Sequence, residues 1–196
     1  GPFWNKKLDF RKITVSDAIN HPNWKMGKKI SVDSATMINK VLEKIEAAIL
    51  FSLDFDKIDI IIHPSSLVHG IVNFIDGNSL MLLSEPDMKI PISCALNWPK
   101  RAKNDINAID LKKIKKLDFF EANPRIFPSL TLFKYLYDNK INYGKLIALN
   151  SSNELAVESF LKKKIKFIDI IKVIKNSLLS LDCTAPKNIN DVFDIH

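Results

Sequence analysis

The chain is poor in cysteine and has no long apolar run. Its two cysteines, Cys94 and Cys183, stand in no CxxC or Cys/His pattern. This spacing predicts neither a disulfide framework nor a zinc site, and it suits a reducing cytosol. Nowhere does the sequence approach the ~18 consecutive apolar residues of a membrane-spanning helix, and its first residues lack a basic-then-apolar signal pattern. We therefore expect a soluble protein with no membrane partner.

Glycine is also scarce, and the five glycines form no GxGxxG-like loop of the kind that binds a dinucleotide. The net charge of +7 makes nucleic acid a partner to consider. However, the lysines are scattered, and the runs at 112–116 and 162–166 carry no interleaved aromatic residues. We expect no nucleic-acid partner. The competing hypothesis, a basic RNA-associated domain, predicts steeply salt-dependent binding.

The strongest pattern lies in residues 21–49. With 46% hydrophobic residues, the chain of 196 residues can bury a substantial core in one large or two small domains. From residue 21 onward we expect a polar loop, then a strand over 28–32, and then one long amphipathic helix over 34–52. The apolar positions on one side of this predicted helix are Met37, Ile38, Val41, Leu42, Ile45, Ala48 and Ile49.

The other side of the predicted helix carries Asn39, Lys40 and Glu43, three and four residues apart on adjacent turns. An amide, an ammonium and a carboxylate can therefore converge on one small object. Ser34 stands at the predicted start, where it can cap free N–H groups or share them with an anion. Phosphate is the ligand that this arrangement favours. The alternative is a solvated face with a Lys–Glu pair.

The loop before this helix brings an imidazole, an aromatic side chain and a flexible joint together, in His21, Trp24, Met26 and Gly27. Residues 1–28 as a whole have the length of a mobile lid. An ordinary surface connection is the alternative.

Three strands are predicted after the helix, over 57–62, 67–75 and 79–84, with a turn at Asp76-Gly77 that joins the last two as a hairpin. His63 and His69 could share one face, but we expect hydrogen-bonded histidines rather than metal ligands. A short helix should end at Trp98-Pro99. Met88 before it is either core packing or a pocket wall.

From 126 onward the pattern is helical. A second helix is predicted to open at Ser151, with Glu154 completing a capping box, and a third spans 167–181. No convergent polar group stands out, so we expect a structural helical bundle. The expected fold class is an α/β (α+β) catalytic domain with an open sheet of about three to four strands flanked by helices, followed by this bundle.

Four segments resemble the 1-deoxy-D-xylulose 5-phosphate reductoisomerase family in order along nearly the whole chain. They are HPNWKMGKKISVDSATMINK with LEKIEA, IIHPSSLVHG, SEPDMKIPI and ALNSSNELAVESFL. The resemblance implies the NADPH-dependent isomerisation and reduction of 1-deoxy-D-xylulose 5-phosphate to 2-C-methyl-D-erythritol 4-phosphate, in non-mevalonate isoprenoid synthesis.

The resemblance also implies roles for single residues. Ser34, Asn39 and Lys40 would bind the substrate phosphate with help from His21, and Glu43 would bind both the substrate and a divalent cation, Mg²⁺ or Mn²⁺. Trp24 would cover the substrate, Met88 would wall the pocket, and Gly27 would let NADPH approach. Glu43, His21 and Trp24 would form this chain's share of the catalytic centre.

The family's architecture implies that residues 1–99 are part of a catalytic and dimerisation domain of a homodimer, 100–124 a connection and 125–196 a helical bundle. The NADPH-binding domain and the acidic motif with the other metal ligands would lie outside these residues. We expect a cytoplasmic location in a bacterium, or a plastid in a eukaryote, and a fragment that is inactive alone. The alternative is a catalytically silent dimerisation or scaffold module.

Overall fold

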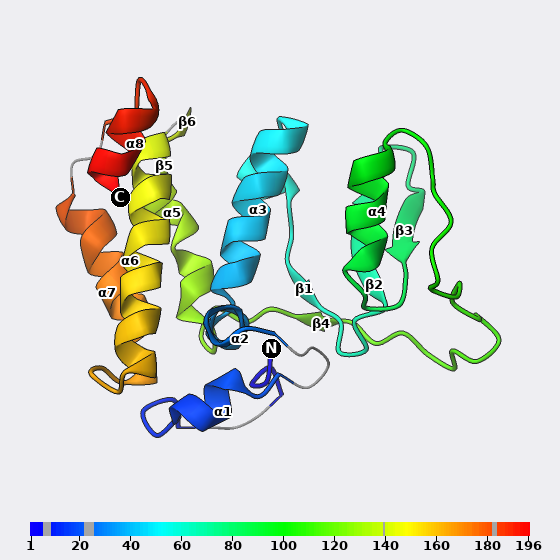
Figure 1. Cartoon of the computed structure of the whole chain (residues 1–196), viewed down its shortest axis with the longest axis horizontal. Helices are drawn as coiled ribbons and strands as arrows, with labels where there is room; N and C mark the ends of the chain where they lie inside the picture. The colour runs from blue at the N-terminus through cyan, green and yellow to red at the C-terminus, as the bar shows by residue number, and fades with distance from the viewer. Residues whose placement is uncertain (6–8, 22–25, 139, 182–183) are drawn as a thin grey trace. The chain divides into compact units, whose positions relative to one another are not determined.

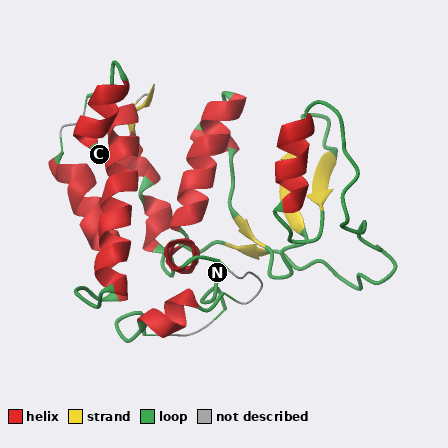
Figure 2. Cartoon of the chain, in the orientation of Figure 1, coloured by secondary structure: helices red, strands yellow, loops and turns green. Residues whose placement is uncertain are grey.

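The structure is a computed structural model that describes residues 1–5, 9–21, 26–138, 140–181 and 184–196. These residues form two compact units, Gly1–Ile60 with Ala122–His196, and Ile61–Glu121. Figure 1 traces the chain through both units, and Figure 2 shows that helices dominate the first unit. No helix in the described ranges combines the length and apolar character needed to cross a bilayer.

The first unit contains helices from both ends of the chain. They are α1 (Val15–Ile19), α2 (Lys28–Thr36), α3 (Ile38–Phe51), η1 (Phe55–Lys57), η2 (Pro128–Thr131), α5 (Phe133–Leu136), α6 (Tyr143–Leu161), α7 (Phe167–Ser180) and α8 (Ile189–Ile195). The short strands β5 (Tyr137–Asp138) and β6 (Lys140–Ile141) precede α6. The predicted C-terminal helical bundle is therefore present, and it shares one core with α2 and α3.

The core of the first unit follows the predicted apolar stripes. Ile38 and Val41 of α3 are fully buried, and so are Ile170, Ile174 and Leu178, which recur every four residues on α7. Helix α6 runs unbroken through Ser151, so the predicted capping box at this position is wrong. The Ser151 hydroxyl instead donates to the Ile147 carbonyl one turn back, at 3.0 Å, and Asn142 caps the helix.

The second unit contains β1 (Ile61–Ile62), β2 (Val68–Asn73), β3 (Ser79–Leu83), α4 (Lys89–Asn97) and β4 (Phe120–Glu121). The hairpin β2–β3 and its turn are confirmed, with Gly77 at φ 88°. The predicted strand over 57–62 shrinks to β1, because η1 takes up its start. The α+β fold class is confirmed, although the strands pair in twos, β1 with β4, β2 with β3 and β5 with β6.

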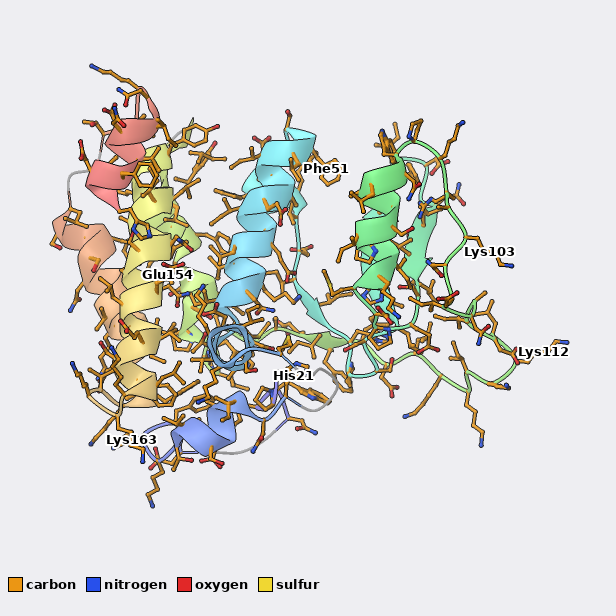
Figure 3. The ribbon with its side chains drawn as sticks, in the orientation of Figure 1. His21, Phe51, Lys103, Lys112, Glu154 and Lys163 are labelled. Atoms are coloured by element: carbon orange, nitrogen blue, oxygen red, sulfur yellow. The ribbon has the colours of Figure 1, made fainter. Side chains whose placement is uncertain are left out.

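Both histidines of the second unit are hydrogen-bonded, as expected. His63 Nδ1 donates to the Asp118 carbonyl at 2.8 Å, and its Nε2 accepts from the Ser65 hydroxyl at 2.7 Å. His69 Nε2 donates to the Ser84 carbonyl at 3.1 Å. Nearby lysines such as Lys103 and Lys112 are exposed and point outward from the segment after α4 (Figure 3). Cys94 is a free thiol, and Cys183 lies outside the described residues.

Candidate functional site

The candidate site lies at a sharp bend between two helices where the sequence predicted a strand followed by one helix. Residues 28–32 belong to α2 rather than to a strand, and Met37 adopts a left-handed conformation, φ 62° and ψ 18°, between α2 and α3. Such a backbone is uncommon for a residue other than glycine. It separates Ser34, in the last turn of α2, from Asn39 and Lys40, in the first turn of α3.

Ser34 is therefore not a helix cap, which corrects the sequence prediction. Helix α2 begins after Gly27, and its residues from Ser31 to Thr36 are all buried because α2 packs against α1, α3 and α6. Helix α2 ends at the left-handed Met37, whose N–H donates to the Ser34 carbonyl. At the start of α3, the Ile38 N–H donates to Thr36 Oγ1 at 3.4 Å, and the N–H groups of Lys40 and Val41 donate to the Met37 carbonyl.

The first turns of α3 keep the three predicted polar residues together. Lys40 Nζ donates to both carboxylate oxygens of Glu43, at 2.9 and 2.7 Å. The side-chain Oδ1 of Asn39 is buried and has no hydrogen-bond partner among the described residues. A buried amide oxygen without a partner costs stability. Of Asn39, Lys40 and Glu43, it is therefore Asn39 whose side chain still lacks a hydrogen bond to its oxygen among the described residues.

His21 lies within electrostatic reach of this group. Burial lowers the pKa of its imidazole, and the positive charge of Lys40 lowers it further. Gly1 itself lies against Ser34, because a Cβ on this glycine would come 2.2 Å from the Ser34 carbonyl oxygen and 3.3 Å from its hydroxyl. Gly1 therefore lies beside Ser34 and within electrostatic reach of His21 and Lys40, so the three side chains share one part of the first unit. Their hydroxyl, imidazole and ammonium groups can all donate hydrogen bonds to an anion.

Glu43 is the only predicted metal ligand, and the described residues contain no group of three or more His, Cys, Asp or Glu side chains able to hold an ion. Its carboxylate is exposed, and a hard oxygen donor suits Mg²⁺ or Mn²⁺. The residues present therefore fit one ligand of such an ion and do not complete a site.

The remaining predicted site residues are Gly27, Met88 and Trp24. Gly27 is exposed just before α2, with nothing within 4 Å of where a Cβ would stand, so the backbone can be approached closely. Met88 lies in the second unit and is 57% exposed. Trp24 lies outside the described residues. Within the predicted lid, Phe3 is buried and packs edge-on against Phe167, at 5.6 Å between ring centroids.

A cavity of about 330 Å³ lies elsewhere in the first unit, beyond the C-terminal end of α3. It is lined mainly by Ile49, Leu53, Phe55, Tyr137 and neighbouring residues, and by none of the predicted site residues.

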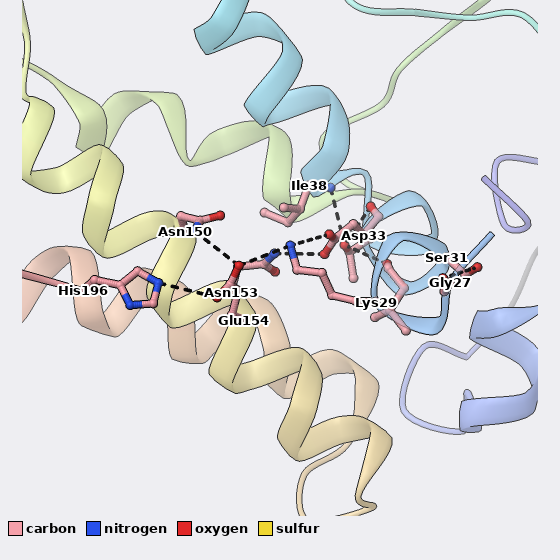
Figure 4. A network of polar contacts seen from close by, with 11 residues as sticks. Gly27, Lys29, Ser31, Asp33, Ile38, Asn150, Asn153, Glu154 and His196 are labelled. Carbon is pink, nitrogen blue, oxygen red and sulfur yellow. Dashed lines mark hydrogen bonds and ion pairs between the residues drawn. The ribbon is translucent and has the colours of Figure 1, made fainter. Parts of the chain in front are cut away.

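One connection was not predicted from the sequence. Asn153 of α6, fully buried, donates through Nδ2 to Asp33 Oδ1 of α2 at 2.9 Å (Figure 4). Lys29 Nζ lies 3.1 Å from the other oxygen of Asp33 and 4.0 Å from Glu154. The available signal was the run of polar residues at 151–153 in α6, all of them buried in the structure. The sequence pattern could not show which residue these polar side chains contact, because the partner of Asn153 lies 120 residues away in the chain.

Comparison with known families matches two stretches of the chain. Residues 83–196 match the DXP reductoisomerase C-terminal domain, and residues 1–51 match the 1-deoxy-D-xylulose 5-phosphate reductoisomerase C-terminal domain. Among curated relatives, the 1-deoxy-D-xylulose 5-phosphate reductoisomerase of Chloroherpeton thalassium is 48% identical over 198 residues, covering 100% of this chain and 50% of the relative. That of Endomicrobium trichonymphae is 47% identical over 178 residues, covering 91% of this chain and 46% of the relative.

Solved structures give the same result. A DOX-P reductoisomerase in complex with NADPH, fosmidomycin and magnesium superposes with a TM-score of 0.83 at 40% identity, covering 95% of this chain and 47% of that one. The Zymomonas mobilis 1-deoxy-D-xylulose 5-phosphate reductoisomerase in complex with NADPH has a TM-score of 0.83 at 37% identity, with the same coverage. The chain spans about half the length of the relatives it matches.

Proposed function

The chain belongs to the 1-deoxy-D-xylulose 5-phosphate reductoisomerase family, and on this premise we propose that the protein containing it converts 1-deoxy-D-xylulose 5-phosphate to 2-C-methyl-D-erythritol 4-phosphate with NADPH. The relatives carry this enzyme's name, and solved neighbours hold NADPH and magnesium. Residues 1–99 would then be part of the catalytic and dimerisation domain, 100–124 a connection and 125–196 the helical bundle. The activity would need the remaining half of the protein.

This chain's contribution would be the phosphate subsite. Lys40 would donate to the phosphate, the Ser34 hydroxyl and the Asn39 amide would hydrogen-bond to it, and His21 would close the site. The observation that carries this proposal is that His21 and Lys40 interact electrostatically while Ser34 lies beside Gly1 in the same part of the unit. Burial is the main cause of the lowered His21 pKa, and the charge of Lys40 adds to it. A bound anion would offset the effect of this charge, so binding should be accompanied by proton uptake.

The Lys40–Glu43 ion pair suggests how the same turn could serve phosphate and metal. The Lys40 ammonium donates to both oxygens of Glu43 and neutralises this carboxylate. A divalent cation on Glu43 would take over this role, and Lys40 would be released toward the phosphate. When bound, the cation would polarise the carbonyl and hydroxyl oxygens of the sugar, and Gly27 would leave room for NADPH. Trp24 and Met88 would cover and wall the substrate.

We also propose that the protein is a homodimer through the second unit. The hairpin β2–β3 exposes several apolar side chains, among them Val72, Phe74, Leu80 and Leu82. Monomeric proteins rarely leave such a surface in water. Bacterial relatives suggest a cytoplasmic location, and we propose neither a nucleic-acid nor a membrane partner.

The test uses the full-length protein. NADPH oxidation should require both 1-deoxy-D-xylulose 5-phosphate and Mg²⁺, and Glu43→Gln should abolish the dependence on metal. Lys40→Ala should raise the substrate KM by roughly ten- to a hundredfold, the value of a lost charge-assisted hydrogen bond. Lys172→Ala is the matched control, because Lys172 forms an i,i+3 ion pair with Asp169 at 2.9 Å on α7. Unchanged kinetics for both Lys40→Ala and Glu43→Gln would refute the site assignment.

A catalytically silent scaffold is the second candidate. The specific observation in its favour is that Lys40 and Glu43 form an ion pair with each other. Such pairs are common on solvent-exposed helix faces that bind nothing. This hypothesis predicts that the full-length protein stays inactive with NADPH, substrate and Mg²⁺.

A further inference from the structure

Asn153 of the helical bundle makes a buried polar contact with the residue next to Ser34 of the proposed phosphate subsite. Its side chain is fully buried on α6, and its Nδ2 donates to Asp33, the residue directly before Ser34 (Figure 4). Asp33 is itself only 4% exposed. A buried carboxylate needs strong partners, since its desolvation is otherwise uncompensated.

The two partners of Asp33 have different consequences. Lys29 stands one turn earlier on α2, so its ion pair with Asp33 moves with the helix. Asn153 comes from another helix, so its hydrogen bond with Asp33 ties the rotation of α2 to α6. The Ser34 side chain follows that rotation because helix backbone and side-chain direction are coupled.

Stability alone does not account for an amide at this position. The Oδ1 of Asn153 is buried and has no hydrogen-bond partner among the described residues. A buried acceptor without a partner is unfavourable, whereas an apolar pair of similar shape would avoid this cost. The amide therefore lowers stability in one respect while specifying a single arrangement of Asp33.

We propose that Asn153 is a positioning residue of the phosphate subsite, which acts through Asp33 to hold Ser34 in place relative to Asn39 and Lys40. This inference rests on the proposed function. It gives the helical bundle, which the sequence suggested was structural only, a direct part in substrate binding. Asn153 itself does not touch the substrate.

The experiment compares variants of the full-length enzyme. Asn153→Ala should raise the KM for 1-deoxy-D-xylulose 5-phosphate about tenfold, as expected for one lost hydrogen bond to a charged group. The KM for NADPH should not change, and kcat should stay within about threefold. Asn150→Ala is the matched control, because this amide on the same helix makes only a 3.4 Å contact with Glu154. It should leave both KM values unchanged.

Asn153→Asp separates positioning from general destabilisation. It places a second carboxylate beside Asp33. The other charged or titratable groups nearby are Lys29 of α2, Glu154 of α6 and His196 after α8, whose Nε2 lies 3.5 Å from Glu154. At low pH the two carboxylates can share one proton, and the resulting hydrogen bond replaces the one that the Asn153 amide donates to Asp33. At high pH both carboxylates are charged and repel each other. The substrate KM of this variant should approach the wild-type value near pH 6 and the Asn153→Ala value near pH 8, after correction for the wild-type pH profile.

The outcomes distinguish the two levels of the proposal. Suppose that Lys40→Ala raises the substrate KM. If Asn153→Ala then leaves the substrate KM unchanged, or raises the KM for substrate and for NADPH equally, the positioning role is refuted and the phosphate subsite stands. If Lys40→Ala also leaves the substrate KM unchanged, the subsite is wrong and the positioning role falls with it. Should Asn153→Ala fail to fold, the pH dependence of Asn153→Asp decides, and a flat profile relative to wild type refutes the inference.

Discussion

The Ser129→Ala substitution tests whether the bend between α2 and α3 depends on one hydrogen bond from the C-terminal half of the chain. The fully buried Ser129 hydroxyl of η2 donates to the Thr36 carbonyl at 2.6 Å. Thr36 is the last residue of α2, and the left-handed Met37 takes the following N–H groups out of line. The Thr36 carbonyl therefore needs a hydrogen-bond donor from outside the helix.

The expected cost follows from burial. Removing the hydroxyl leaves a buried carbonyl without its donor, which costs about 1–3 kcal/mol, more than the net value of an ordinary hydrogen bond. For a chain of this length, about 2 kcal/mol corresponds to a decrease in Tm of roughly 4–8 °C. Thermal unfolding followed by circular dichroism measures this shift directly.

Thr131→Ala is the control for this substitution. Thr131 lies two residues further along η2, and its hydroxyl donates to the Pro128 carbonyl at 2.7 Å. This bond is local and exposed, so its loss should cost less than about 0.5 kcal/mol. A Ser129→Ala variant no less stable than Thr131→Ala would refute the reasoning that the bend requires the buried donor.

Three further outcomes are expected. Gly77→Ala should destabilise the hairpin by about 1 kcal/mol in chemical denaturation because its φ is 88°, whereas Gly70→Ala, at an open position without a positive φ, should be neutral; equal effects would contradict this. Since His21 has a lowered pKa in the folded chain, its contribution to stability should be lost as the pH falls below about 6.5. Sulfate binding should tighten over the same range and lose this pH dependence in His21→Gln. Leu149→Ala, at a fully buried position on α6, should cost roughly 2–5 kcal/mol, and Leu155→Ala, 62% exposed on the same helix, should cost under about 1 kcal/mol. Similar unfolding midpoints for the two would refute the assignment of the core face.

Two signals that act over a few residues were read correctly. The turn at Asp76-Gly77 between two apolar runs predicted the observed hairpin, because only a short loop with a positive φ joins such strands. The three- and four-residue spacing of Asn39, Lys40 and Glu43 placed them on adjacent turns, as α3 confirms. Their roles in binding phosphate and metal stay predictions.

The errors arose where local signals compete with packing. Ile30 and Val32 favoured a strand by propensity, yet α2 forms because Val32 and Ala35 are fully buried against neighbouring helices. Ser151 and Glu154 matched a capping box, yet α6 continues through them because its apolar face is buried on both sides of Ser151. The local sequence pattern alone could not show that burial against other helices outweighs strand propensity or a capping motif.

Spacing along the chain was enough to predict the apolar stripes and the polar residues that share a turn, and the motifs were enough to indicate the family. These properties need no information about distant residues. The folded arrangement was needed to show that α2 ends at a left-handed Met37, that Ser129 donates to Thr36, and that Asn153 hydrogen-bonds to Asp33 across 120 residues. Such contacts depend on how buried polar groups find partners once the helices have packed, and no local spacing encodes that choice.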